Sequence, residues 1–350
     1  MTVRPDFIDQ WVVRDSGLKP FAPKLKERQV AVDRMARQLT GGRGNLAQFA
    51  LGHLYFGLQR DETGWVFREW APHATATYLV GEMTDWREMD AFALTRIDDN
   101  GAWELRLPVD ALAHGMHYRL RIHWPGGAGD RIPAWTRRVV QDPNTLIFNA
   151  QVWAPAQAYT WRHRDFVPPT DGLYIYEAHV GMALEAERVG TWLEFADQVL
   201  PRIVRAGYNT LQLMAVQEHP YYASFGYQVS NFFAPSSRFG TPEELKALVD
   251  RAHGLGLAVV MDLIHSHAVA NEVEGISNFD GSGYQYFHAG ARGRHPAWDS
   301  RCFDYAKPQV LHFLLSNCRY WLEEFGVDGF RFDGVTSMLY HHHGLGKAFS

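Results

Sequence analysis

An arginine and an aspartate two residues apart, Arg331 and Asp333, have the types and spacing best suited to chemistry in this chain. They lie in the sequence GFRFDG, at residues 329–334, which alternates as a strand does. Side chains two residues apart in a strand point to the same face, roughly 7 Å apart, so Arg331 and Asp333 are neighbours. Phe330 and Phe332 then pack outward against helices. The guanidinium keeps the carboxylate ionised, as a nucleophile requires; a buried structural ion pair is the equally supported alternative.

A second polar group, Asp262, His265 and His267, lies at the end of another apolar run, residues 257–264. Asp262 and His267 reach a common mouth, where a carboxylate and an imidazole can hydrogen-bond sugar hydroxyls. His265 and His267 also have a spacing found among metal ligands. A hydrogen-bonding role is the more common one for such a pair, so the metal site is the alternative.

Two further segments follow predicted strands and contain polar and aromatic residues. Residues 176–181 (YEAHVG) end the first strand of the C-terminal region, and residues 225–228 (FGYQ) follow the second and contain Tyr227. Because the carboxyl ends of parallel strands meet at one edge, we expect both segments at the rim of one site. Packing of the loops themselves is the alternative for both.

Strands and helices alternate after Gly172, which predicts βα units around a parallel sheet. Four runs read as strands: residues 173–177, 210–214, 257–264 and 329–335. Three helices lie between them, at residues 192–204, after the capping residue Thr241, and at residues 308–325. A long insert, residues 268–305, interrupts the third unit, and loops of this length are usually functional.

The number of strands leaves two architectures open. A complete (β/α)8 barrel has eight strands and typically about 250 residues, whereas the sequence from residue 171 to Ser350 predicts only four. The region is therefore either a smaller open α/β sheet or the N-terminal half of a TIM barrel.

Two other kinds of segment precede this region. A helix is predicted at residues 24–39, and the glycine-rich residues 41–44 end it. Short alternating strands follow, separated by turn residues, which is typical of a β-sandwich; they lie at residues 65–70, 75–80, 103–107 and 118–124. The predicted domains are a helical segment, a β-sandwich, a proline-rich linker and the α/β region, at residues 1–60, 61–155, 156–170 and 171–350.

The composition argues against several classes of partner. The chain has 34 Lys+Arg and 39 Asp+Glu, a net charge of −5 with no block of like charge, which disfavours nucleic acid and membrane surfaces. No run approaches the roughly 18 apolar residues of a membrane span, and two cysteines, Cys302 and Cys318, suit a reducing compartment. We therefore expect a soluble, cytoplasmic protein. Its 14% aromatic content also suits sugar binding, because pyranose rings pack on aromatic planes.

Together the motifs resemble those of the α-amylase family of glycoside hydrolases and glycosyltransferases. The resemblance rests on Asp262 with His267, on GFRFD at residues 329–333, and on the Gly-Tyr pair that ends at Tyr227. It narrows to the glycogen and starch branching enzymes through three features, the segments YEAHVGM, HSH and VTSMLYHHHG at residues 176–182, 265–267 and 335–344. The segments FREWAP and GEMTDW, at residues 67–72 and 81–86, are similar to the β-sandwich glucan-binding module of that family.

The resemblance implies a role for each of these residues. Asp333 is the implied nucleophile and Arg331 its charge partner. Tyr227, Asp262 and His267 are implied to hold the sugar ring on the nonreducing side of the scissile bond. The implied reaction cleaves an α-1,4-glucan, holds the segment as a covalent ester and re-attaches it through an α-1,6 bond. The implied partners are donor and acceptor glucans such as glycogen, amylose and amylopectin, with no cofactor and no metal.

The chain also departs from the family pattern. Retaining glycosidic chemistry needs a second carboxylate, about 5 to 5.5 Å from the first, to protonate the leaving oxygen. The family's acid is a Glu from the fifth strand region, and its third carboxylate is an Asp from the seventh, neither of which is present. Glu218, Glu272 and Glu274 are acidic residues in loops, but none lies in a motif similar to that of the acid. We therefore expect an N-terminal part of a longer enzyme, inactive by itself.

Three alternatives remain open at this point. An amylase or debranching hydrolase would use the same scaffold, although the HSH and YHHH segments argue against it. A noncatalytic glucan-binding protein is compatible with the missing acid. A metal-dependent barrel hydrolase would use His265 and His267.

Overall fold

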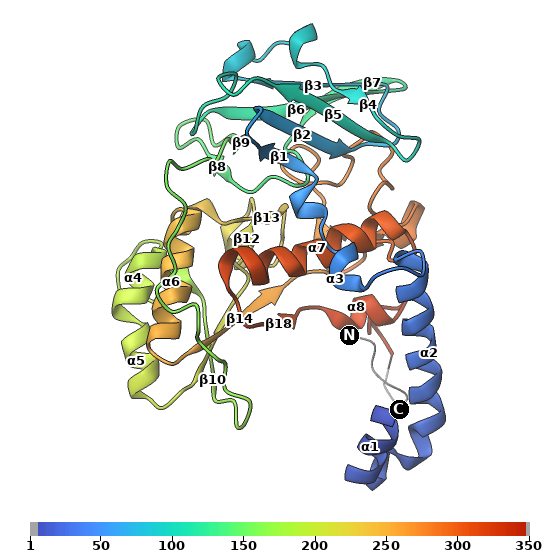
Figure 1. Cartoon of the computed structure of the whole chain (residues 1–350), viewed down its shortest axis with the longest axis vertical. Helices are drawn as coiled ribbons and strands as arrows, with labels where there is room; N and C mark the ends of the chain where they lie inside the picture. The colour runs from blue at the N-terminus through green and yellow to red at the C-terminus, as the bar shows by residue number, and fades with distance from the viewer. Residues whose placement is uncertain (1–5, 348–350) are drawn as a thin grey trace.

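The computed structural model describes residues 6–347 of the chain (Figure 1). Antiparallel strands form one end of the molecule, a parallel sheet with its helices lies next to them, and the N-terminal helices run along one side. Residues 1–5 of the predicted helical segment and residues 348–350 of the predicted α/β region lie outside the described residues. Among the described helices, none has the length and apolar character needed to cross a membrane.

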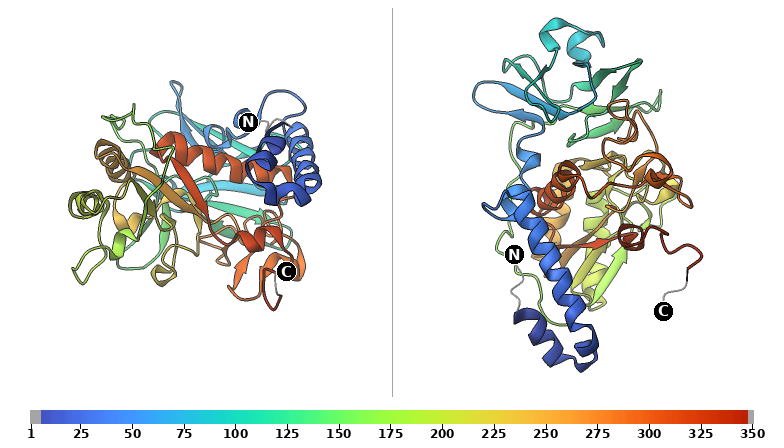
Figure 2. Two further views of the ribbon diagram at one scale, coloured as in Figure 1. Left: turned by 90° about the horizontal axis from the view of Figure 1, so that it is seen from below. Right: turned by 90° about the vertical axis from the view of Figure 1, so that its right-hand side faces the viewer.

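The N-terminal segment is helical, as its apolar periodicity predicts. It comprises α1 (Asp6–Arg14), η1 (Ser16–Phe21), α2 (Ala22–Leu39), α3 (Leu46–Phe49) and η2 (Gly52–Leu54). The predicted turn at residues 41–44 separates α2 from α3, and three of its residues are glycines with positive φ. The helix α2 has no buried residue, and Figure 2 shows it extending with α1 away from the rest of the molecule.

Two antiparallel sheets form the predicted β-sandwich. One has the strand order β1-β2-β5-β4 and the other β3-β6-β9-β8, with β7 paired to β6. The strands are β1 (Gly57–Arg60), β2 (Trp65–Trp70), β3 (Ala76–Gly81), β4 (Thr95–Arg96), β5 (Ala102–Leu107), β6 (His117–Trp124), β7 (Gly127–Arg131), β8 (Val139–Gln141) and β9 (Phe148–Gln151). Phe67 of β2 and Tyr118 of β6 meet edge to face between the sheets, with ring centroids 6.3 Å apart. The four predicted strands end within one residue of the observed ones, because alternation marks the buried face of each strand.

A parallel sheet of order β10-β11-β14-β18 follows the sandwich. Its strands are β10 (Ile175–Ala178), β11 (Thr210–Leu213), β14 (Ala258–Leu263) and β18 (Gly329–Phe332). The register pairs Asp262 with Arg331, and it aligns Glu177 and Gln212 with Val260. These side chains therefore share one face of the sheet. The other face is apolar and packs against helices; Leu211, Leu213, Val259, Met261 and Leu263 are at most 1% exposed.

The helices that accompany this sheet are α4 (Trp192–Gln198), α5 (Leu200–Arg205), α6 (Pro242–Gly254), α7 (Pro308–Phe325) and α8 (Val335–Leu339). The single helix predicted over residues 192–204 is wrong, because it is divided in two. Pro201 is the second residue of α5 and has no N–H to donate, so it fits the first turn of a new helix better than a helix interior. The capping box predicted at Thr241 is present, since Glu244 and Thr241 each accept the other's backbone N–H.

Short elements complete the architecture. The remaining 3-10 helices are η3 (Glu82–Thr84), η4 (Asp90–Phe92), η5 (Val180–Met182), η6 (Tyr222–Ser224), η7 (Ser237–Phe239) and η8 (Gly290–Gly293). The remaining strands are β12 (Gln217–Glu218) and β13 (Asn231–Pro235), which pair, and the small sheet of β15 (Ala268–Val269), β16 (Arg294–His295) and β17 (Ser300–Arg301). The insert at residues 268–305 thus has an ordered core, in which Phe279, Tyr286 and Phe287 are fully buried.

Candidate active site

The five residues singled out from the sequence meet at the carboxyl ends of β14 and β18. Asp262 lies in β14 and Arg331 lies beside it in β18, where the register pairs them directly. Asp333 follows β18, and its backbone N–H donates to the carbonyl of Leu263 at 2.9 Å, which continues the ladder by one more residue. The prediction that Arg331 and Asp333 share a face is confirmed by their ion pair.

Arg331 bridges two carboxylates. Its Nη1 lies 2.7 Å from Oδ1 of Asp333 and 3.0 Å from Oδ2 of Asp262. Asp262 is fully buried, whereas the side chains of Asp333 and Arg331 are 23% and 45% exposed. The two carboxylates therefore differ in exposure. Asp262 is enclosed, whereas Asp333 is partly exposed to solvent, where a substrate has access.

Tyr227 reaches this cluster from the loop after β11. Its hydroxyl donates to Oδ2 of Asp262 at 2.7 Å. The loop turns sharply just before it, with φ of 54° at Phe225 and 90° at Gly226. A Cβ on Gly226 would overlap the carbonyl oxygen of Ala215, so only glycine allows this close approach. The glycine thus places the tyrosine against the aspartate.

His267 joins the same mouth through the backbone of Tyr227. Its Nε2 lies 2.9 Å from the Tyr227 carbonyl oxygen, which accepts the imidazole N–H, and its Nδ1 lies 2.9 Å from Oγ of Ser266. Both ring nitrogens therefore have protein partners, and burial lowers the pKa of His267, which favours the neutral ring.

Burial shifts the pKa of Asp262 in one direction, and its two contacts, Tyr227 and Arg331, shift it in the other. Burial raises its pKa, while the hydrogen bond from Tyr227 and the charge of Arg331 lower it, and the net shift is upward. Burial also raises the pKa of Tyr227, and the hydrogen bond to Asp262 adds to that effect, so the hydroxyl remains a donor. Burial lowers the pKa of Arg331, but the two carboxylates outweigh it and the net shift is upward.

Two residues that sequence reasoning missed belong to the cluster. Gln212, in β11, donates from Nε2 to Oδ1 of Asp262 and to Oε1 of Glu177, both at 2.9 Å. Trp298, from the insert, is 38% exposed and lies beside His267, with ring centroids 4.9 Å apart. A polar residue inside an apolar strand was the available signal for Gln212.

The two histidines of the metal alternative point to different partners. Nε2 of His265 lies 2.9 Å from the side-chain oxygen of Asn317 in α7, whereas His267 contacts the loop of Tyr227. Burial lowers the pKa of His265 to about 4. Within residues 6–347, no group of three or more His, Cys, Asp or Glu side chains is arranged to hold a metal ion.

The structure also places two other residues from the sequence analysis, Phe332, which was expected to pack against helices, and Glu218, to which no catalytic role was assigned. Phe330 packs against the core, but Phe332 is 39% exposed, because β18 is an edge strand of the sheet in the described chain. Glu218 is fully buried, and its carboxylate accepts from the backbone N–H of Ser237 at 2.7 Å and pairs with Arg238. Its contacts are therefore those of a structural residue.

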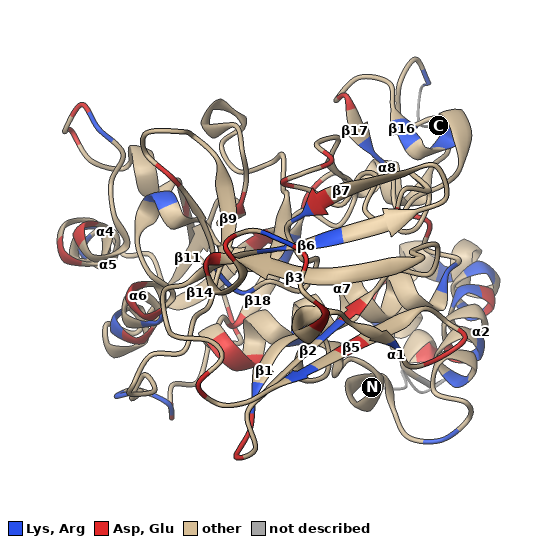
Figure 3. Cartoon of the chain, turned by 90° about the horizontal axis from the view of Figure 1, so that it is seen from above, with Lys and Arg blue, Asp and Glu red and all other residues tan. Residues whose placement is uncertain are grey.

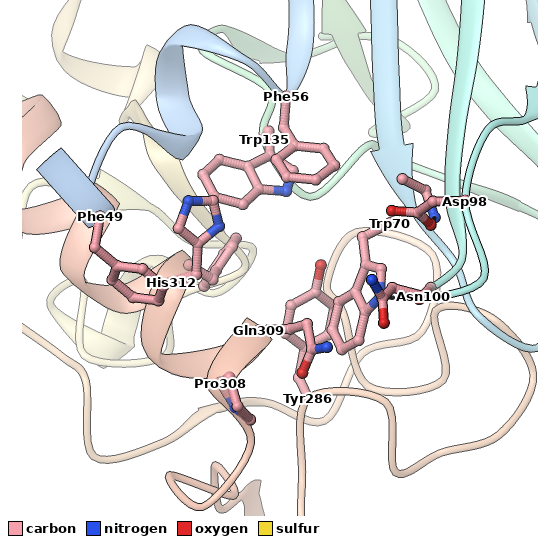
Figure 4. Close-up of a pocket in the computed structure, with 12 residues that line it drawn as sticks. Phe49, Phe56, Trp70, Asp98, Asn100, Trp135, Tyr286, Pro308, Gln309 and His312 are labelled. Atoms are coloured by element: carbon pink, nitrogen blue, oxygen red, sulfur yellow. Dashed lines mark hydrogen bonds between the residues drawn. The ribbon is translucent and has the colours of Figure 1, made fainter. Parts of the chain in front are cut away.

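A separate cavity of about 310 Å³ lies between the sandwich, the N-terminal segment and α7 (Figure 4). Its walls are mainly aromatic, and Phe56 stacks on Trp135 with centroids 5.0 Å apart. Asp98, Asn100 and Gln309 add polar atoms. Sequence reasoning missed this cavity, since its residues come from three distant parts of the chain.

Two family models match the chain, one in the β-sandwich and one in the α/β region. Residues 55–145 match the family Carbohydrate-binding module 48 (Isoamylase N-terminal domain), and residues 200–303 match the family Alpha amylase, catalytic domain. The 1,4-alpha-glucan-branching enzyme of Rhizophagus irregularis is 48% identical over 343 residues, 96% of this chain and 50% of that protein. By sequence, the chain is a relative of the 1,4-alpha-glucan-branching enzymes. The resemblance to branching enzymes that the motifs predicted is thus confirmed.

Other relatives agree. The 1,4-alpha-glucan-branching enzyme of Yarrowia lipolytica is 47% identical over 96% of this chain and 50% of its own length. The chloroplastic/amyloplastic 1,4-alpha-glucan-branching enzyme 2-2 of Arabidopsis thaliana is 47% identical over 96% of this chain and 42% of its own length. The chain therefore spans about half the length of the curated relatives it matches.

Solved structures support the fold. A D470A mutant of pullulanase from Paenibacillus barengoltzii, complexed with maltotetraose, superposes with a TM-score of 0.67. It is 20% identical and covers 86% of this chain and 52% of its own. Pullulanase from Bacillus acidopullulyticus gives a TM-score of 0.65 at 21% identity, over 81% of this chain and 38% of its own. At this identity the likeness concerns the fold alone.

Proposed function

We propose that this chain provides the glucan-binding module and the nucleophile half of a branching enzyme, which moves α-1,4-glucan segments to α-1,6 positions. The observation that carries the proposal is the single guanidinium of Arg331 between a buried Asp262 and a solvent-facing Asp333. A partly exposed carboxylate held ionised by a cation is suited to attack on a sugar. The identity to branching enzymes over 96% of the chain supports the substrate class.

In the proposed reaction, Asp333 is the nucleophile. One carboxylate oxygen bonds to the anomeric carbon as the α-1,4 bond breaks, and the departing glucan takes its proton from an acid outside this chain. The 6-hydroxyl of an acceptor glucan then attacks the same carbon, loses its proton to that group, and releases the carboxylate. The intervening ester must be kept from water. Neither step calls for a metal or another cofactor.

The remaining residues of the cluster are proposed to hold the sugar. Asp262, Tyr227 and His267 provide acceptors and donors for the hydroxyls of one ring. Gln212 fixes the carboxylate of Asp262. One face of the Trp298 ring stacks on His295, with centroids 3.8 Å apart, and the remaining exposed part of the ring is proposed to contact the sugar.

The domain plan is part of the same proposal. We propose a helical segment, a glucan-binding sandwich, a linker and half of a (β/α)8 barrel, at residues 1–60, 61–155, 156–170 and 171–350. The parallel order of the four strands and the polar face of their sheet support the half-barrel. The aromatic cavity at the edge of the sandwich suits a second stretch of the glucan.

A cytoplasmic location and a role in glycogen or starch synthesis complete the proposal. Figure 3 shows charged residues of both signs on α2 and α6, which fits the expectation of a partner that is neither nucleic acid nor membrane.

The proposal is tested by Asp333→Asn in a protein that contains this chain and branches amylose. The amide keeps the shape but cannot attack, so branching should fall by several orders of magnitude while affinity for glycogen stays nearly unchanged. New α-1,6 linkages and glycogen affinity are the two measurements. Retention of a tenth of the activity contradicts the assignment of Asp333.

One alternative has an observation in its favour. The chain has no acid motif of the expected kind, which suits a noncatalytic glucan-binding protein. If the entire gene product binds amylose tightly and forms no new α-1,6 linkages, this second function replaces the first. Release of free maltodextrins without transfer points to an amylase or debranching hydrolase.

A further inference from the structure

An elongated depression follows the linker on the helix-covered side of the parallel sheet, and we call it the linker groove. Its central part, of about 410 Å³, is lined by Trp153, Tyr159 and Trp161 on the linker side and by α6 and α7 on the other. A neighbouring part, of about 540 Å³, shares Trp161 and continues to Phe166. Figure 1 shows the linker descending past α6 toward β10. None of the residues of the candidate active site lines it.

A buried carboxylate holds the linker in place. Asp250 of α6 is 3% exposed, and it accepts the hydroxyl of Tyr159 at 3.0 Å. It also accepts the backbone N–H groups of Arg162 and His163, at 3.0 and 2.8 Å. Binding surfaces that are ordered in advance lose less entropy when a ligand arrives. The linker side of the groove is therefore fixed in place before a ligand binds.

The rings of the linker lie on the helix ends without a side chain between them. A Cβ on Gly326, at the end of α7, would lie 2.9 Å from Cη2 of Trp161, and one on Gly254, at the end of α6, would lie 2.6 Å from Cε1 of His163. Trp161 also meets Tyr159 edge to face, with centroids 5.2 Å apart. The ring of Trp153 contacts His114 and Arg138. Trp153, Tyr159 and Trp161 nevertheless all remain partly exposed, so part of each ring is available to a ligand.

The opposite wall presents carboxylates and cations. The charged residues that line the central part are three acids and three bases, Glu243, Glu323, Glu324, Arg137, Arg164 and Lys246. Oε2 of Glu243 accepts the indole N–H of Trp153 at 2.9 Å, and Glu324 pairs with Lys246. Several acceptors and donors thus face three aromatic rings. This combination suits a ligand with apolar C–H faces and many hydroxyls. The three carboxylates and three cations leave no net positive charge that would attract a phosphate backbone.

We propose that the linker groove binds a stretch of α-1,4-glucan chain, outside both the candidate active site and the cavity beside the sandwich. The inference rests on the proposed function for its substrate class. A polymer held here is retained on the protein while another part of it reaches Asp333. The two parts of the groove adjoin, since Trp161, Arg164 and Glu323 line both. This continuity suits a chain of glucose units that extends over both parts better than a single sugar.

The test is maltoheptaose binding by isothermal titration, with Trp153→Ala, Trp161→Ala and the control Trp11→Ala. Trp11 is a 41% exposed tryptophan of α1, far from the linker groove. Each groove variant should bind about two- to tenfold more weakly, the range that loss of one aromatic contact represents. The control should bind as the wild type does. Equal affinities in all four proteins overturn the proposal.

A second measurement avoids dependence on folding of the variants. In the wild-type protein, hydroxyl-radical footprinting should show that maltoheptaose protects Trp153 and Trp161 but not Trp11. Equal oxidation with and without the sugar contradicts the groove. A change in oligomeric state of the Trp161→Ala variant without a change in sugar affinity assigns the groove to a protein contact and also contradicts the proposal.

The outcomes also separate this inference from the proposed function. A wild-type protein that branches amylose and binds maltoheptaose, with variants of unchanged affinity, leaves the function standing and removes the groove. A wild-type protein that neither branches nor binds glucans removes both.

Discussion

Removal of the Arg331 guanidinium should destabilise the chain in a pH-dependent way. In Arg331→Gln, the fully buried Asp262 loses its cation and keeps only the donors of Tyr227 and Gln212. Breaking a fully buried pair costs about 3 to 5 kcal/mol. Because Arg331 is 45% exposed and the two donors remain, we expect a loss of about 1 to 2 kcal/mol at pH 7.

The sign of the pH dependence follows from Asp262. Burial already raises its pKa in the folded wild type, and loss of a neighbouring positive charge raises it further. Between the unfolded pKa of about 3.9 and this raised value, the folded variant binds more protons than its unfolded chain. Its stability relative to the wild type therefore falls as the pH rises through this interval, and the difference is smallest near pH 4.

Equilibrium urea denaturation between pH 4.5 and pH 7.5 measures the effect in a protein that contains this chain, with hydrogen exchange in β14 as the local readout. Arg87→Gln is the matched control, because Arg87 is 78% exposed and lies 3.8 Å from an equally exposed Asp85. Its loss should be below about 0.5 kcal/mol at every pH. An Arg331→Gln loss that is the same at both ends of the range, or equal to that of the control, refutes the reasoning.

Three further predictions concern the same chain. Gly226→Ala should destabilise by more than about 1 kcal/mol in thermal melts, because its φ of 90° and the nearby Ala215 carbonyl exclude a Cβ; an unchanged melt contradicts this. EDTA should leave branching unchanged in an iodine-stain assay, and loss restored by zinc would move the chemistry to His265 and His267. Residues 1–350 expressed alone should bind glycogen weakly and form no α-1,6 linkages. They should also aggregate, as measured by light scattering, because the edge strands β10 and β18 are unpaired on one side in the described chain. A monomeric and active protein would contradict the half-barrel.

Much of the fold follows from local sequence patterns. The period-two alternation marked the strands of the sandwich, and the apolar runs marked the four parallel strands, because burial of one or both faces leaves a direct trace in residue type. The motif around Arg331 and Asp333 was also readable, since strand geometry alone puts both side chains on one face. The break between α4 and α5 was readable from Pro201 but was not predicted.

The missed residues depend on contacts between distant segments. Trp298 lies in the insert, and its position beside His267 follows from the path of an irregular loop, for which no periodicity exists. Gln212 is a single polar residue in a buried strand, and only the register with β10 and β14 shows that it joins Glu177 to Asp262. The aromatic cavity combines three regions, so no local pattern indicates it.

The two faces of the parallel sheet argue for the half-barrel over an open sheet. In an open doubly wound sheet, helices cover both faces and both are apolar. Here one face carries Glu177, Gln212, Asp262 and Arg331, and among the described residues helices pack on the other face only. A polar face free of helices is expected for strands whose inner side and carboxyl ends line a substrate site. In the half-barrel that we propose, the second carboxylate that the proposed chemistry requires would lie on strands that face Asp333 across the barrel.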